Sequence, residues 1–227
     1  MKAIDPQIEA LFQAGVHLGH KKNRIHPKAK KYIYIMQNGI SVIDLTQTQT
    51  LLKKAQEFVS KLKKENKVMI VIMTKKVVAG FVAEMCKKNS IPFITMKWPA
   101  GLLTNFEMIM KNVKKMNEMR KQQLEGAWNT FIKHEQIALK KELRKLERFY
   151  GGLSDLTKKP DALFIVDIKK EKNAVKEARE LKIPVVAVTD TNVNPDFIDY
   201  PIPGNDDSQS SIEYLVKEIV EAYTKTI

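Results

Sequence analysis

The chain has 227 residues, 44% hydrophobic and 29% charged, which fits one globular α/β domain or one such domain with an insertion. Its apolar runs fall well short of the roughly 18 residues that a membrane span needs, so we expect a soluble protein without a membrane partner. Lysine and arginine total 39 against 26 acidic residues, and this +13 charge favours nucleic acid as the partner, unless a genome-wide lysine bias produces it.

The first part of the chain predicts a short helix, a basic loop and a β-hairpin. Asp5 and Pro6 are typical of an N-cap and a first helical residue, and Gly15 ends the helix. A basic loop follows over residues 17–31. Residues 31–44 then form a hairpin, because an Asn-Gly pair between two β-rich runs supplies the positive φ angles of a tight turn.

The basic loop is the main candidate for a functional site. It holds three of the four histidines, and His17 with His20 raises the alternative of a metal site. No cysteine or further histidine nearby completes a ligand set. A basic loop with glycine and proline, ending in Tyr32 and Tyr34, is better suited to phosphate contacts combined with ring stacking.

Strands and helices alternate through most of the remaining chain. Thr46 is expected to cap a helix that runs to about Leu62, and continuous apolar strands begin after it. The expected strands are residues 68–73, 91–95, 162–166, 185–188 and the edge strand 200–203, and the expected helices are 77–88, 173–181 and 211–223. This alternation predicts a doubly wound, mostly parallel sheet.

Residues 105–150 interrupt the alternation with a helical pattern that contains no strand. Two apolar stripes, the second starting at Ile132, advance by alternating three- and four-residue steps. The spacing predicts an antiparallel coiled-coil hairpin inserted into an α/β domain of residues 1–104 and 151–227. Its lysines are either an ordinary solvated face or candidates for docking RNA or protein: Lys111, Lys114, Lys115, Lys121, Lys133, Lys140, Lys141 and Lys145.

Residues 97–105 form a glycine-bearing turn between a strand and a helix. A helix N-terminus in this position can receive an anion. The turn matches neither the phosphate loop nor the dinucleotide fingerprint, so nucleotide binding has little support. Thr104 in this turn is either a helix cap or a ligand contact.

Acidic and amide side chains gather after the later strands: Asp167, Asp190, Asn192, Asn205, Asp206 and Asp207. The carboxyl edge of a doubly wound sheet is its usual ligand site, and carboxylates there can hold Mg²⁺. Asp190, Asp206 and Asp207 are therefore weak metal candidates. Helix capping and turn formation by these residues is the alternative that we prefer.

Several segments together resemble the S2 family of small-subunit ribosomal proteins, in its bacterial or organellar form. Two of them are Ala-Gly-Val-His-Leu-Gly-His at 14–20 and Ile-Asp-Tyr-Pro-Ile-Pro-Gly-Asn-Asp-Asp at 198–207. The other matching segments are residues 38–45, 74–76, 98 with 101–105, 151–153, 160–167, 177–179, 183–187, 190–192 and 211–212. They follow the order of the family over essentially the whole chain.

The resemblance implies a flavodoxin-like sheet with a coiled-coil insertion. It implies a structural constituent of the small subunit, not an enzyme, that binds small-subunit ribosomal RNA and neighbouring ribosomal proteins and supports assembly and translation. In bacteria it also implies docking of ribosomal protein S1. No cofactor is implied, and a structural Mg²⁺ ion stays open.

Carried onto this chain, the resemblance predicts a set of RNA contacts. The primary candidates are Lys21, Lys22, Arg24, His26, Lys28, Lys30 and Lys31. The secondary candidates are Lys75, Lys76, Lys97 and Asn105.

Two other functions compete with this interpretation. One is a Mg²⁺-dependent enzyme that acts on a phosphorylated small molecule at the acidic edge. The other is a protein-interaction adaptor that binds its partners only through the insertion. We expect no small-molecule substrate. The single cysteine, Cys86, and an N-terminus without the apolar stretch of a secretory signal predict a protein of the cytoplasm, with an organelle as the alternative, and the resemblance implies that it resides on the ribosome.

Overall fold

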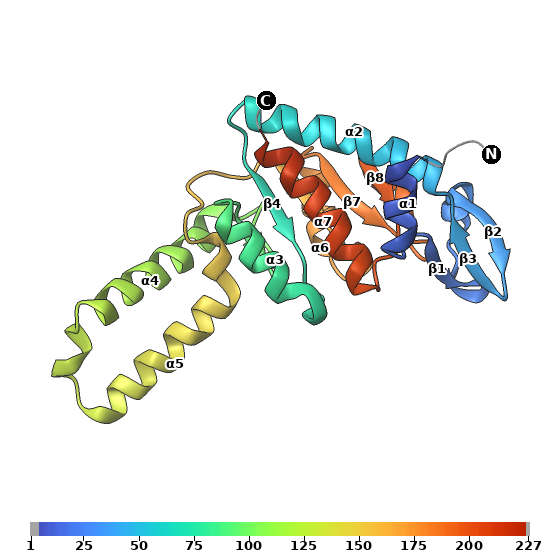
Figure 1. Cartoon of the computed structure of the whole chain (residues 1–227). Coiled ribbons are helices and arrows are strands. Elements are labelled where there is room, and N and C mark those ends of the chain that lie inside the picture. Colours follow the sequence, from blue (N-terminus) through green and yellow to red (C-terminus); the bar gives the residue numbers. More distant parts are fainter. Residues whose placement is uncertain (1–4, 226–227) are drawn as a thin grey trace.

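A computed structural model of the chain describes residues 5–225. It places a five-stranded sheet at the centre, with helices on both faces and a pair of long helices projecting from one side (Figure 1). No helix within residues 5–225 combines the length and the apolar character needed to cross a membrane.

The central sheet is parallel throughout, as the alternation of elements predicts. Its strands are β4 (Met69–Ile72), β5 (Phe93–Ile94), β6 (Ala162–Ile165), β7 (Val185–Thr189) and β8 (Tyr200–Pro203). They lie in the order β5-β4-β6-β7-β8, and every neighbouring pair is parallel. Counted along the chain this is the order 2-1-3-4-5 of flavodoxin-like sheets, and β8 is the expected edge strand.

Helices cover the sheet on both faces because its strands are apolar on both sides. The first face packs against α1 (Pro6–Gln13), α2 (Leu45–Lys64), α3 (Lys76–Lys88) and α7 (Gln209–Thr224). The second face packs against α6 (Lys172–Glu180), the turn after β5 and the base of the projecting helices. Each face has its own core of fully buried side chains, so the carboxyl edge of the sheet is held from both sides.

The N-terminal region differs from the predicted loop. Residues 18–21 form a strand, β1 (Leu18–Lys21), which pairs with β3 (Ile40–Ile43) beside β2 (Ile33–Gln37). The hairpin β2–β3 is confirmed, because Asn38 and Gly39 both have positive φ angles. The cap predicted for α2 is wrong.

The N-cap of α2 is Asp44, two residues before the expected Thr46. The Asp44 carboxylate accepts hydrogen bonds from the backbone N and the hydroxyl of Thr46, at 3.0 and 2.7 Å. Thr46 is therefore the donor and not the cap, since a carboxylate satisfies the free N–H groups of the first turn better than a hydroxyl two residues later.

The insertion between β5 and β6 consists of α4 (Phe106–Leu124) and α5 (Lys133–Tyr150), which run in opposite directions (Figure 1). Lys115 pairs with Glu142 across the two helices. The predicted second stripe is too long, because Ile132 is 68% exposed and lies before the first residue of α5. The remaining apolar positions pack into the core of the second face of the sheet.

Candidate nucleic-acid interface

The basic segment, residues 17–31, is held against the carboxyl edge of the central sheet. After β1 it continues as two 3-10 helices, Lys22–Arg24 and Pro27–Tyr32. The backbone N of His26 donates to the carbonyl oxygen of Thr191, which follows β7, at 2.8 Å. The segment is therefore a fixed backbone with a defined set of outward side chains.

Four of the predicted phosphate contacts are exposed and form no ion pair with any of residues 5–225. They are Lys21, Lys22, Arg24 and Lys30. Two further lysines, Lys28 and Lys31, share the Asp196 carboxylate at 3.3 and 3.1 Å. These surface pairs are weak, so a phosphate group can compete for either ammonium group.

His26 is half-buried at the point where the basic segment meets the loop after β7. The backbone N of Lys28 donates to its Nδ1 at 3.2 Å, so Nδ1 is the acceptor. In the neutral ring the proton then sits on Nε2, which is left as a hydrogen-bond donor. Two residues past Tyr32, the ring of Tyr34 is 76% exposed and available for stacking.

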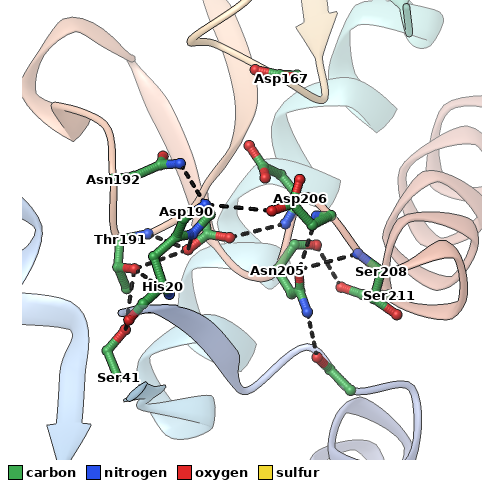
Figure 2. A network of polar contacts seen from close by, with 12 residues as sticks. His20, Ser41, Asp167, Asp190, Thr191, Asn192, Asn205, Asp206, Ser208 and Ser211 are labelled. Atoms are coloured by element: carbon green, nitrogen blue, oxygen red, sulfur yellow. Dashed lines mark hydrogen bonds and ion pairs between the residues drawn. The ribbon is translucent and has the colours of Figure 1, made fainter. Parts of the chain in front are cut away.

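The acidic side chains at the carboxyl edge form one network with two cations, part of which Figure 2 shows. His20 Nδ1 lies 3.1 Å from Asp190, and Nε2 lies 3.4 Å from Asp207. The Lys75 ammonium lies 3.0 Å from Asp206 and 2.6 Å from Asp207. Lys75 also donates to the backbone carbonyl of Asp206. The geometry favours an internal electrostatic role for Lys75 over the predicted phosphate contact.

The network shifts the titration of its members in opposite directions. Burial, followed by the charge of Asp190, raises the pKa of Asp206 to about 7. The hydrogen bond from Lys75 lowers the pKa of Asp207. The hydrogen bond to Asp190 raises the pKa of His20 and outweighs the effect of burial, so a positive imidazole is favoured beside the two carboxylates.

This geometry bears on the metal alternatives. Among residues 5–225 no group of three or more histidine, cysteine, aspartate and glutamate side chains is arranged to hold a metal ion. The weak candidates Asp190, Asp206 and Asp207 face Lys75 and His20, which supply positive charge where a cation would bind. The Asp190 carboxylate also accepts a hydrogen bond from the backbone N of Asp206 at 3.3 Å, which ties the loop after β7 to the loop after β8.

The glycine-bearing turn after β5 binds an anion, which is the carboxylate of Glu177 in the same chain. The Glu177 carboxylate accepts hydrogen bonds from Trp98 Nε1 and from the backbone N of Gly101, Leu103 and Thr104, at 2.9, 2.8, 3.1 and 3.4 Å. Burial opposes the charged form, but these donors lower the pKa of Glu177. The turn is therefore filled internally and offers no nucleotide site.

The N-cap of α4 is Asn105, whose side chain makes no capping hydrogen bond. Thr104, the alternative cap, instead directs its hydroxyl to Glu177 at 3.4 Å. Asn105 and Lys97 are both exposed, as is Lys76 at the start of α3. These three secondary candidates follow β4 and β5, whereas the basic segment lies against the loops after β7 and β8.

Comparison with known proteins decides the family. The family described as Ribosomal protein S2 matches residues 11–226 of this chain. The chain belongs to the ribosomal protein S2 family. It is also similar to "Small ribosomal subunit protein uS2" of Chlorobaculum tepidum, with 38% identity over 215 residues, covering 95% of this chain and 86% of that protein. The family that the sequence motifs predict is confirmed.

Membership in the S2 family bears directly on the competing functions. The family consists of structural ribosomal proteins, so the expectation that this chain is not an enzyme is supported. The acidic edge, which was the best argument for an enzyme, is an internal network in this S2 family member.

Sequence reasoning missed several residues that position the interface of this S2 family member. Thr191 Oγ1 accepts from the backbone N of His20 at 2.9 Å and lies 3.2 Å from Ser41 Oγ. A side chain at Gly19 would come within 2.5 Å of Ser41 Oγ and 2.9 Å of Thr191. The signal for this approach was the second glycine of the motif at residues 14–20, since glycine permits close contact of a backbone with its neighbours.

Proposed function

We propose that this chain is a structural constituent of the small ribosomal subunit and that its basic segment positions it on ribosomal RNA. The observation that carries the proposal is the set of four exposed cations on a fixed backbone: Lys21, Lys22, Arg24 and Lys30. Lysine and arginine contacts to phosphate oxygens set the position of a protein on RNA without reading its sequence. Lys28, Lys31 and His26 extend the same surface.

The fixed backbone explains why such contacts are effective. His20, Ser41 and Thr191 tie the segment to the sheet before RNA is present. The segment consequently loses little conformational entropy when it binds, and the binding free energy is not spent on ordering it. Lys21, Lys22 and Lys30 form no ion pair with the described residues, whereas the acidic network is already paired with His20 and Lys75.

The insertion supplies a second surface in this proposal. We infer that residues 105–150 form an antiparallel coiled coil that projects from the α/β domain of residues 1–104 and 151–227. All eight of its candidate lysines are exposed: Lys111, Lys114, Lys115, Lys121, Lys133, Lys140, Lys141 and Lys145. This arm docks RNA or a neighbouring ribosomal protein, with S1 as a partner in bacteria, and the protein resides on ribosomes of the cytoplasm or of an organelle.

The salt dependence of RNA binding tests the basic segment. Replacing Lys21, Lys22, Arg24 and Lys30 by alanine should weaken binding to small-subunit ribosomal RNA and reduce the slope of log affinity against log salt by about three to four units. Filter binding of the full chain between 50 and 200 mM salt, about the range over which such contacts are lost, measures both effects.

A charge-matched variant is the control for this measurement. Lys54, Lys64, Lys87 and Lys88 are exposed on α2 and α3, and their replacement removes the same charge from another surface. An equal slope for the two variants would contradict the assignment of the basic segment. Sedimentation of a cell lysate adds a second test, because a chain that never migrates with small subunits would contradict the ribosomal function itself.

A further inference from the structure

A groove of about 710 Å³ lies beside α6 and is also lined by His26 of the basic segment. We call it the α6 groove. Its walls come from α6, from the turn after β6 and from the 3-10 helix Pro195–Phe197. Its volume lies within the range of roughly 300–1,000 Å³ that small-molecule-sized ligands occupy. Of its lining residues only His26 is among the predicted RNA contacts.

The floor of the α6 groove is apolar. Ile168, Val175 and Val193 contribute side chains that are 7%, 5% and 6% exposed. Phe197 lies at the surface of the same groove with 47% of its side chain exposed. An aromatic ring held open to solvent beside a packed apolar floor is a suitable platform for another planar group.

The rim of the α6 groove is strongly basic. Lys172, Lys176 and Arg179 occupy positions i, i+4 and i+7 of α6, so they line one face of the helix over about 10 Å. Lys169 adds a fourth cation, against one carboxylate from Glu180. All four cations are exposed, and the ion pairs formed among residues 5–225 do not use them.

Two features connect the charged rim with the floor. The Arg179 guanidinium lies over the Phe197 ring, with its central carbon 4.6 Å from the ring centroid. This planar pair offers stacking surface of the kind that unpaired bases use. His26 also lines the groove, and its Nε2 is the hydrogen-bond donor described above. The groove therefore continues the phosphate-binding surface of the basic segment.

We propose that the α6 groove binds an unpaired nucleotide segment of RNA, an inference that rests on the proposed RNA-binding function. A base stacks against Phe197 and the Arg179 guanidinium, and the flanking phosphates pair with Lys172 and Lys176. Duplex RNA does not expose its base faces, so the groove selects single strands, loops or bulges. An acidic peptide matches the lysines and Arg179 but leaves the exposed Phe197 ring without a planar partner, which is why RNA is the occupant that the geometry favours.

Binding of the full chain to short strands tests the groove. The probes are a ten-nucleotide oligouridine, an abasic strand with the same number of phosphates, and an RNA duplex, each followed by fluorescence anisotropy. The wild type should bind oligouridine at least about fivefold more tightly than the abasic strand, as one stacked base provides. Phe197→Leu keeps the apolar volume and should remove most of that difference.

Charge variants complete the test. Lys172→Ala with Lys176→Ala should weaken binding of oligouridine and of the abasic strand alike and lower the salt slope by about 1.4 units, or 0.7 for each lost contact. Lys54→Ala with Lys64→Ala removes the same charge from α2 and should change neither value. Thermal unfolding of each variant confirms that the comparison is made between folded proteins.

The outcomes separate this inference from the proposed function. The groove variants could bind oligouridine as tightly as the Lys54→Ala, Lys64→Ala control and still bind ribosomal RNA through the basic segment. That result overturns the inference about the groove and leaves the proposed function standing. A wild-type chain that binds no ribosomal RNA contradicts the proposed function. A third outcome also overturns the inference. If the groove variants no longer bind a ten-residue polyglutamate peptide but still bind oligouridine like the wild type, the groove belongs to an acidic protein segment.

Discussion

Lys75 shows how one side chain can hold together three loops at the carboxyl edge of the sheet. It follows β4, yet its ammonium contacts Asp206 and Asp207 after β8 and lies 3.6 Å from Asp167 after β6. Buried charges of one sign are costly unless an opposite charge compensates them. Lys75 provides that compensation on one side of the network and His20 provides it on the other.

The pH dependence of stability should report the buried carboxyl of Asp206. Its pKa is about 7 in the folded chain against an ordinary value of 3.8, so the folded state binds the proton more tightly. The contribution of this group to the free energy of unfolding therefore falls between pH 3.8 and 7, by up to about 1.4 kcal/mol per pH unit. In urea unfolding from pH 5 to 8, the free energy of unfolding of Asp206→Asn should rise relative to that of the wild type up to pH 7. Above pH 7 the difference should stay constant.

An exposed carboxyl serves as the control for Asp206. Lys31 lowers the pKa of Asp196, whose stabilising effect is already complete at pH 5. Asp196→Asn should consequently show no drift relative to the wild type over the same range. Parallel curves for Asp206→Asn and the wild type would be inconsistent with a proton held by Asp206 near neutral pH.

Replacing Glu177 by its amide should lower the free energy of unfolding strongly, although the shape of the side chain barely changes. Glu177→Gln keeps the volume but directs an amide N–H group at donors such as Trp98 Nε1 and Gly101 N. Because Glu177 is only 9% exposed, we expect a loss of about 2–3 kcal/mol in the free energy of unfolding. Urea unfolding followed by tryptophan fluorescence measures it, with exposed Glu180→Gln on the same helix as the control, and equal losses would contradict the assignment.

At the scale of elements, a strand can be predicted from the sequence when its apolar pattern is strong, and it is missed when that pattern is weak. The strands β4, β6 and β7 are continuous apolar runs, so their burial on both faces is readable from the sequence. β1 has only four residues, Leu-Gly-His-Lys, and becomes a strand by pairing with β3. A glycine and two polar side chains carry no strand signal of their own, because the pairing partner decides their conformation.

Two glycines in secondary structure predict opposite effects of the same substitution. Gly80 lies inside α3 with an ordinary φ angle and open space where the methyl group of an alanine would lie, so Gly80→Ala should stabilise the chain by about 0.5–1 kcal/mol. Gly39 has equally open space but a φ of +77°, so Gly39→Ala should destabilise it by about 1–2 kcal/mol. Thermal unfolding of both variants measures the difference, and shifts of the same sign would contradict the backbone argument.

At the scale of the whole molecule, the fold is predictable from the sequence and the pairing of charges is not. Alternating strands and helices determine a parallel sheet, and the acids after its strands have to meet at one edge. The partners of those acids lie elsewhere in the chain: Lys75 is 131 residues from Asp206, and Trp98 is 79 residues from Glu177. Local patterns do not encode such pairs, so the sequence predicts neither Lys75 as the partner of Asp206 nor Glu177 as the anion bound by the turn after β5.

Shortening the insertion tests whether the two proposed surfaces act separately. Replacing residues 121–141 by a short glycine-serine loop removes four candidate lysines, Lys121, Lys133, Lys140 and Lys141. It also removes the buried Trp128 near the tip but keeps the buried residues Val113, Met116 and Leu143. Affinity for ribosomal RNA should fall by less than about tenfold, because the basic segment is intact, while binding of protein neighbours is lost. Filter binding and pull-down from dissociated subunits measure the two effects, and complete loss of RNA affinity would assign RNA binding to the arm.

The anchoring of β1 has a consequence for the order of events during synthesis. His20 is made near the start of the chain, but its backbone N bonds to Thr191, 171 residues later. While the ribosome is still extending the polypeptide, the basic segment has emerged without the loops that hold it. The RNA-binding surface consequently matures only when the last strands have been translated, so an incomplete nascent chain does not present it in finished form.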